Sequence, residues 1–366
     1  MKYRRLRRAG AFVAAAILLL AIVQGMADAL PGPDLLDFGS FLASGRAAAR
    51  GDNPYGIYPE TFHVVLPGFE SWNPNLNPPV ALPLFQWFAR FDPHDGFRMW
   101  WALSFVCQAA LVWMLEARYR RGVVAVLWAF ALAGFWDTLV LGQIYAPLAL
   151  AATGAWLLED RGRPIAAGLL IGVVAAVKPN FLVWPALLLL SGHHRSALAA
   201  IAAAAVLSAL PLALYGPEVY LQWAGLIAND EARGVFLTNA SLAGIAQRLG
   251  WPEGGRVLGV ALLAGLGLWA WRCRPRPLEA AAVALAAGLL ASPLAWIHYT
   301  LFLVPVIMAT RLTPALGLSA ALMVVPVPAV LALLDSPAWV KASLGSVYGW
   351  AVTLCLVALM AGRPAR

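Results

Sequence analysis

Residues 2–29 read KYRRLRRAGAFVAAAILLLAIVQGMADA, in which five basic side chains precede an apolar run that starts at Ala11. Such a run is long enough to cross a membrane as a helix, and basic residues before it mark the cytoplasmic side. Ala27-Asp28-Ala29 is similar to a signal-peptidase site. Because the rest of the chain is also apolar, we expect an uncleaved first helix that leads outward from the cytoplasm.

The composition of the whole chain indicates a membrane protein with many spans. Apolar residues make up 61% of the 366 residues and charged residues 12%, about half the charge of a soluble domain. The spans must be helices, because lipid offers no water to backbone groups and the sequence lacks the alternation of a barrel. We therefore expect an all-α polytopic protein in which residues 1–366 form one integral membrane domain.

The net charge of +8 does not indicate nucleic-acid binding. The basic residues lie in short clusters between apolar runs, which is typical of cytoplasmic loops. Cys107, Cys273 and Cys355 lie in or beside predicted spans and lack metal-ligand spacing. We expect no disulfide framework and no metal site.

Placing every basic cluster in the cytoplasm gives about twelve spans with both termini cytoplasmic. Only one span fits between the first helix and Arg118, yet residues 78–91 and 97–115 are both apolar. The first run has about 14 residues, short of the roughly 20 that cross a bilayer, and it contains three prolines. We expect it to be a re-entrant or juxtamembrane helix on the outer side.

The predicted topology puts the distinctive polar residues on one face. Residues 31–77 become the first outer loop, and residues 215–255 a second large one. A third of the acidic residues fall between Asp28 and Glu70, and acids gathered at one membrane surface suggest a site there. The expected location is a bacterial cytoplasmic membrane, with the active site on its outer face.

Asp34 and Asp37 are the candidate acid–base residues of the first outer loop. Asp34 could cap a helix and Asp37 stand in its first turn, where the helix dipole favours carboxylates. Alternatively, one of them accepts the proton of an attacking hydroxyl. The sequence leaves open which of the two is the base.

Further polar residues mark other outer turns. Lys178 is one of only three lysines, and Pro179-Asn180 follows it. It is either a snorkelling interfacial residue or a compact cation for a phosphate. His298 stands between two apolar runs beside Trp296, and a polar or phosphate-facing role is predicted for it. Gln143 and Tyr145 offer a carboxamide and a phenol at another turn.

Other residues have a simpler interpretation. Asp137 is expected to be structural. Any one of the candidate phosphate contacts Arg46, Arg50, Arg233 and Arg248 could equally be solvated. The chain has no phosphate-binding glycine loop in a strand-to-helix context and no Asp-x-Asp pair for a metal-bound nucleotide sugar. An enzyme of this composition would draw its activated substrate from the lipid phase.

These patterns resemble glycosyltransferase family 87, the polyprenol-phosphate-mannose-dependent mannosyltransferases of the GT-C superfamily. The matching motifs, in chain order, are Asp37-Phe38-Gly39-Ser40-Phe41 with Gly51-Asp52-Asn53-Pro54-Tyr55, Asn77-Pro78-Pro79, Gly142-Gln143-Ile144, the stretch from Arg163 to Gly172 followed by Ala176-Val177-Lys178-Pro179, Asn239-Ala240-Ser241-Leu242, and Ser292-Pro293 with Trp296-Ile297-His298-Tyr299.

The resemblance implies a GT-C fold and a metal-independent, inverting transfer without a cofactor. The donor would be a polyprenyl-phosphate sugar such as mannose, and the acceptor a lipid or glycan of the cell envelope. Asp37 would be the base, with His298 also in the chemical step. Substrate contacts are expected from Asp34, Arg46, Tyr55, Asn77, Gln143, Tyr145, Lys178, Asn239 and Trp296.

Two residues depart from the family pattern. Tyr145 and Ile297 stand where the family usually has Asn and often has an acid, which leaves the sugar and the acceptor open. The main alternative function is a transporter or a flippase of lipid-linked glycans. Such proteins carry ionisable groups near the bilayer midplane and often have repeated halves, and neither feature is evident here. A membrane scaffold and a glycan polymerase or ligase are weaker alternatives.

Overall fold

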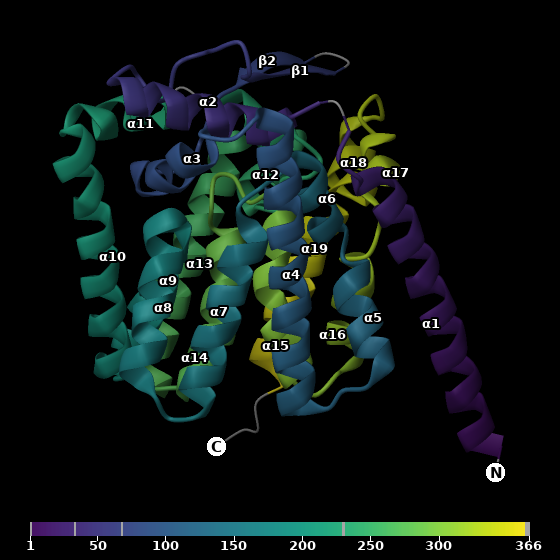
Figure 1. The fold of residues 1–366 in the computed structure, drawn as a ribbon. Helices are drawn as coiled ribbons and strands as arrows, with labels where there is room; N and C mark the ends of the chain where they lie inside the picture. Colours follow the sequence, from purple (N-terminus) through teal and green to yellow (C-terminus); the bar gives the residue numbers. More distant parts are fainter. Residues whose placement is uncertain (1, 33, 67–68, 229–230, 363–366) are drawn as a thin grey trace.

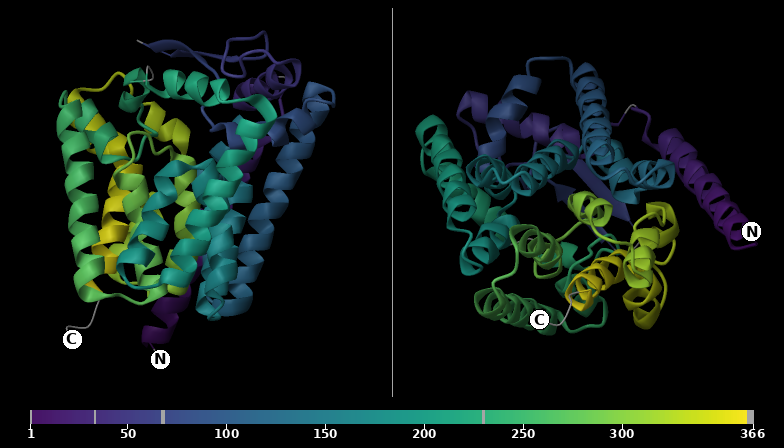
Figure 2. Two further views of the ribbon diagram at one scale, coloured as in Figure 1. Left: turned by 90° about the vertical axis from the view of Figure 1, so that its left-hand side faces the viewer. Right: turned by 90° about the horizontal axis from the view of Figure 1, so that it is seen from below.

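A computed structural model describes residues 2–32, 34–66, 69–228 and 231–362 of the chain. Helices run side by side between two ends of the molecule, and short elements cover one end (Figure 1). The first helix begins, and the last one finishes, at the other end (Figures 1 and 2). The chain is a mostly helical, polytopic membrane protein, as its composition predicts.

Within the described residues, five helical segments are long and apolar enough to cross a membrane. They are α1 (Lys2–Ala29, with its apolar part Ala9–Ala29), α4 (Pro93–Tyr119), α10 (His194–Tyr215), α13 (Pro252–Cys273) and the segment Ala338–Ala361, which contains α18 (Ala338–Ala342), η5 (Leu344–Ser346) and α19 (Val347–Ala361). A sixth span results if α5 (Val123–Ala131) and α6 (Ala133–Leu141), bent by 41°, count as one.

The other predicted spans correspond to shorter helices. These are α7 (Tyr145–Asp160), α8 (Pro164–Val177), η2 (Pro179–Leu182) with α9 (Val183–Leu190), α14 (Pro277–Leu290), η4 (Ile297–Leu303) with α15 (Val304–Ala309), and α16 (Pro314–Leu322). Prolines stand at the starts of several of them, where the missing N–H costs least. Since lengths near 15 residues fall short of a full crossing, the count of twelve spans stays a prediction.

The covered end is built from the two predicted outer loops. The first contains α2 (Leu36–Arg50), the hairpin of β1 (Phe62–Leu66) and β2 (Phe69–Asn73), and η1 (Pro79–Ala81) with α3 (Leu82–Phe88). The second contains α11 (Glu218–Ala228), η3 (Glu231–Val235) and α12 (Leu242–Arg248), and α17 (Val327–Leu331) lies at the same end (Figure 1). The segment expected to be re-entrant or juxtamembrane is thus the short helix α3 beside α2.

One of the two interpretations of Asp34, that it caps α2, is wrong. The N-cap residue is Leu35, and among the described residues no side chain caps the helix. Leu36, the first residue of α2, has a left-handed φ of 48°, so the chain turns sharply where the helix begins. Asp37 stands in the first turn of α2, as expected.

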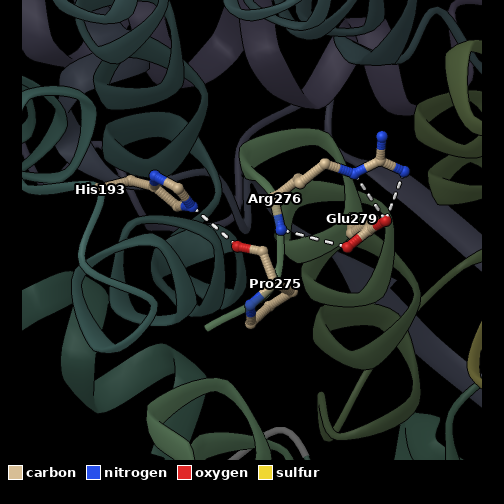
Figure 3. Close-up of polar contacts among 4 residues, drawn as sticks. All are labelled: His193, Pro275, Arg276 and Glu279. Carbon is tan, nitrogen blue, oxygen red and sulfur yellow. Dashed lines mark hydrogen bonds and ion pairs between the residues drawn. The ribbon is translucent and has the colours of Figure 1, made fainter. Parts of the chain in front are cut away.

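We call the elements that cover one end of the molecule, from the two outer loops, the cap. At the opposite end, hydrogen bonds and ion pairs connect neighbouring turns. Nε2 of His193 donates to the carbonyl oxygen of Pro275 at 2.8 Å, and so joins the α9–α10 turn to the α13–α14 turn (Figure 3). At the start of α14, the backbone N–H of Arg276 donates to Oε2 of Glu279 at 3.1 Å, and its guanidinium donates to Oε1 of the same carboxylate (Figure 3). These polar side chains fasten the hairpins and lie far from the cap.

Candidate active site

A cavity of about 280 Å³ lies beneath α2 and the hairpin. Its lining comes from the first outer loop, from the ends of α6, α7 and α8, and from the segments around η3, η4 and α17. The polar or aromatic residues that line it are Asp37, Phe41, Phe62, Ser71, Asn73, Asn77, Asp137, Gln143, Tyr145, Lys178, Arg233, Phe236, Thr238, Trp296 and His298.

Asp37 is a buried carboxylate at the wall of this cavity, with 4% of its surface exposed. Nε2 of Gln143 donates to its Oδ2 at 2.5 Å, and Nδ2 of Asn73 donates to its Oδ1. Burial raises the pKa of Asp37 to about 6, while these two hydrogen bonds and nearby positive charges oppose the rise. A carboxyl with this pKa is ionised near neutral pH and can still accept a proton, as a general base requires.

The α6–α7 turn fixes the position of α2 above the cavity. Gly142 ends α6 with a φ of +69°, and a Cβ there would lie 2.6 Å from Cβ of Phe38. The Phe38 ring stacks on Phe97, and Nε1 of Trp100 donates to the carbonyl oxygen of Gly142 at 2.9 Å. Only glycine fits both the backbone angle and the contact, so the Gly-Gln turn holds Gln143 against Asp37.

Asn73, the last residue of β2, connects Asp37 to a buried cation. Nη1 of Arg233 donates to its Oδ1, and Nη2 of Arg233 donates to the carbonyl oxygen of Trp72 at 2.7 Å. Because the guanidinium can only donate, it fixes the amide so that Nδ2 points to Asp37. Arg233 thus sets the orientation of a residue that holds the carboxylate.

Lys178 brings a second cation into the cavity from the C-terminus of α8. Its Nζ donates to Oδ1 of Asn77 at 2.8 Å and lies 4.6 Å from the centre of the Tyr145 ring. The side chain is buried, and an ammonium has three protons to donate. In the part of the chain that the structure describes, no carboxylate lies within ion-pair distance of Lys178. Donors therefore remain for an anionic ligand.

His298 and Asp137 form the third polar group of the cavity. Nε2 of His298 lies 2.7 Å from Oδ2 of Asp137. The imidazole stacks on Tyr145 with ring centres 5.0 Å apart and an angle of 6° between the planes. A Cβ on Gly134 would lie 2.5 Å from the carbonyl oxygen of Ile297, so glycine lets α6 come close enough to η4 for this pair to form.

Seven of the eleven predicted site residues line the cavity together: Asp37, Asn77, Gln143, Tyr145, Lys178, Trp296 and His298. Four others do not line it. Asp34 is exposed, and Arg46 forms an ion pair with Glu60 on the outer loop. Tyr55 is buried, and its hydroxyl donates to the carbonyl oxygen of Asn77 at 3.1 Å, which supports the cavity wall from behind.

Asn239 is the fourth residue outside the lining. Its Nδ2 donates to the carbonyl oxygens of Gly234 and Pro293, and its Oδ1 accepts from the N–H groups of Ser241 and Ala295. The amide is fully buried and has these four partners. It therefore joins the segment after η3 to the segment before η4, which places Trp296 and His298 without a polar atom to spare for substrate.

Five polar lining residues were not among the predicted site residues: Ser71, Asn73, Asp137, Arg233 and Thr238. Arg233 was one of several candidate phosphate contacts, Asp137 was expected to be structural, and Asn73 carried no prediction. Asn73 could have been found only by predicting the hairpin, whose register pairs it with Phe62. Arg248, another candidate phosphate contact, donates instead to two carbonyl oxygens and to Ser346.

Comparisons with known proteins agree with this picture. The sequence profile of glycosyltransferase family 87 matches residues 75–293, a range that includes Asn77, Gln143 and Lys178 but not Asp37 or His298. A search of curated proteins found no match.

Among solved structures, a crystal structure of ArnT from Cupriavidus metallidurans bound to undecaprenyl phosphate has a TM-score of 0.38 and 17% identity. The alignment covers 96% of this chain and 78% of ArnT. That likeness is weak, and no conclusion rests on it.

The profile match covers more than half of the chain and includes the motifs from Asn77 to Pro293, but not those around Asp37, Tyr55 and His298. It supports a transferase and not a transporter or flippase. The chain belongs to glycosyltransferase family 87.

Proposed function

We propose that this membrane glycosyltransferase moves a sugar from a polyprenyl-phosphate donor to a hydroxyl group of a lipid or glycan acceptor. One observation carries the proposal: the buried carboxylate of Asp37 shares a single cavity with the ammonium of Lys178. Such a cavity offers a base for the hydroxyl and a cation for the leaving phosphate.

The proposed reaction is a single displacement. Asp37 takes the proton of the acceptor hydroxyl while the oxygen of that hydroxyl forms a bond to the anomeric carbon. The bond from that carbon to the phosphate oxygen breaks, and polyprenyl phosphate leaves with the bonding electrons. One displacement inverts the anomeric centre. A positioned base contributes roughly 10² to 10⁴ in rate.

The negative charge that develops on the phosphate would be stabilised by positive groups of the chain. Lys178 has donors that Asn77 does not use, and Arg233 lies on the wall of the same cavity. Fixed cations in a site shielded from water stabilise such a charge strongly. We therefore expect transfer to be independent of divalent metal, with activity retained in excess EDTA.

The membrane orientation follows from the basic clusters of the sequence. The termini would lie in the cytoplasm, and the capped end with the cavity would face the outer side of a bacterial cytoplasmic membrane. Mannose is the sugar that the family suggests. Tyr145 and Ile297 depart from the family pattern, so the assay must compare sugars.

The test is a membrane-fraction assay with matched radiolabelled donors. Polyprenyl-phosphate mannose and polyprenyl-phosphate glucose are offered beside the corresponding nucleotide sugars, with the Asp37→Asn variant as the control. The proposal expects label in product from one of the lipid-linked sugars, and only with the unmodified chain. Label that comes from a nucleotide sugar alone would overturn the donor assignment.

A further inference from the structure

The pair formed by Asp137 and His298 is not used in the proposed displacement. Asp37 has the amides of Gln143 and Asn73 as partners, and Lys178 has Asn77. Asp137 comes from α6 and meets the imidazole at 2.7 Å, on the same cavity. A second buried carboxylate in a site that is to bind a phosphate calls for a separate explanation.

The order of the two side chains shows which of them faces a ligand. The side chain of Asp137 is 14% exposed and that of His298 is 4% exposed. Both ring nitrogens of His298 are shielded: Nε2 faces Oδ2 of Asp137 at 2.7 Å, and Nδ1 has no hydrogen-bond partner in the described part of the chain. The carboxylate therefore lies in front, toward the cavity, and the imidazole supports it from behind.

A carboxylate at this place selects the chemistry of its ligand. It can only accept hydrogen bonds, and it repels a phosphate. Hydroxyl groups are the complementary donors, and a sugar ring presents several of them. Trp296 lines the same cavity, and an indole ring can pack its apolar face against the C–H groups of a sugar.

We propose that Asp137 binds sugar hydroxyls, with His298 as the residue that positions its carboxylate. The inference rests on the proposed function and deepens it, since it assigns one part of the cavity to the phosphate and another to the sugar. The phosphate lies with Lys178 and Arg233, and the sugar lies with Asp137 and Trp296. Asp37 then serves as the base, and Asp137 recognises hydroxyls without taking up their protons.

The sugar that Asp137 contacts belongs either to the donor or to the acceptor. The experiment separates the two by measuring binding of three probes to the full chain in nanodiscs: undecaprenyl phosphate, undecaprenyl-phosphate mannose and methyl α-D-mannopyranoside. Asp137→Asn is compared with Asp335→Asn, which makes the same change at an exposed acid away from the cavity lining. His298→Gln tests the supporting residue.

We expect Asp137→Asn to bind undecaprenyl phosphate within about twofold of the unmodified chain. Its affinity for at least one of the two mannose-bearing probes should fall by about tenfold or more, as for a lost hydrogen bond to a charged group. His298→Gln should show a smaller loss of the same kind, and Asp335→Asn none. A loss confined to the methyl mannoside assigns Asp137 to the acceptor sugar.

Two results would overturn this inference. One is that Asp137→Asn binds each of the three probes as tightly as the unmodified chain does. The other is that its affinity for undecaprenyl phosphate falls as much as its affinity for the mannose-bearing probes. A different failure concerns the proposed function. If the unmodified chain does not bind undecaprenyl phosphate, the lipid donor is wrong whatever Asp137 does.

Discussion

At the scale of single residues, the chemistry depends on how burial and hydrogen bonding divide the ionisable groups. Two aspartates line the cavity, and each has different partners. Amide donors hold Asp37, whereas an imidazole backs Asp137. Neighbouring side chains of this kind give two carboxylates in one site different roles.

The pH dependence of transfer tests Asp37. Its pKa is raised to about 6 because burial disfavours the charged form. A base must be unprotonated, so the rate should rise with pH through about 6. Asn73→Ala removes a hydrogen bond that favours the carboxylate, so the midpoint should move to higher pH. Initial rates measured between pH 5 and 8 give both midpoints.

Glu70→Gln on the same hairpin is the matched control, because Glu70 is exposed and pairs with His63. Its midpoint should equal that of the unmodified chain. A rate that does not depend on pH in this range, or an Asn73→Ala midpoint that moves to lower pH, would contradict the assignment of Asp37.

Replacing Lys178 tests the phosphate contact. A charge-assisted hydrogen bond contributes roughly 1.5–3 kcal/mol, so Lys178→Ala should raise the donor KM about tenfold or more and leave the acceptor KM within about twofold. Lys341→Ala, on α18 and away from the cavity lining, is the control. Steady-state kinetics with each substrate varied in turn give the two constants. Equal effects on both would remove Lys178 from the donor site.

At the scale of elements, the positions of α2 and the hairpin decide whether a site exists. The apolar runs, their prolines and the short helix α3 could be predicted because they follow from hydrophobic length and proline chemistry. The hairpin could not be predicted, since β1 and β2 have only five residues each. Asn73 and the Asp37–Asn73–Arg233 connection were missed with it.

Gly142→Ala tests how the α6–α7 turn positions α2. The substitution adds a left-handed strain of roughly 1–2 kcal/mol, and its Cβ would collide with Phe38. We expect a lower unfolding temperature and a loss of most of the transfer activity. Gly162→Ala is the matched control, because its φ is also positive (+67°) but nothing lies within 4 Å of the added Cβ.

In the control, the free energy of unfolding should fall only by the backbone strain, and the activity should be kept. The reason is that the turn between α7 and α8, which contains Gly162, lies at the end opposite the cavity (Figure 1). Thermal unfolding in detergent and transfer rates measure the two effects. The same losses in both variants would mean that the contact with Phe38 is unimportant.

At the scale of the whole molecule, one end carries the candidate site and the other the basic turns. Composition and charge clusters were enough to predict a polytopic helical protein and to put most site residues on one face. They did not predict which of those residues meet in space. Arg46 and Asn239 carry suitable groups, but an ion pair and four backbone partners occupy them.

Cysteine labelling tests the orientation of the molecule. Cys273 is exposed at the end of α13, whereas Cys107 and Cys355 are buried. In intact spheroplasts, a membrane-impermeant maleimide should leave Cys273 unlabelled until the membrane is permeabilised. A Cys273→Ser, Glu70→Cys variant should be labelled without permeabilisation, because Glu70 is on the exposed hairpin at the other end. The opposite pattern would invert the topology.

The central claim is that the Asp37 carboxylate removes the acceptor proton, and Asp37→Asn tests it most directly. Thermal stability at pH 8 should not fall, because a carboxyl whose pKa is raised from 3.8 to about 6 on folding costs stability as the pH rises between those two values, and that cost is fully present at pH 8. Binding of polyprenyl phosphate should also persist. Under those conditions the predicted result is a loss of roughly 10² to 10⁴ in the transfer rate. Transfer at the unmodified rate by this folded, ligand-binding variant would contradict the account.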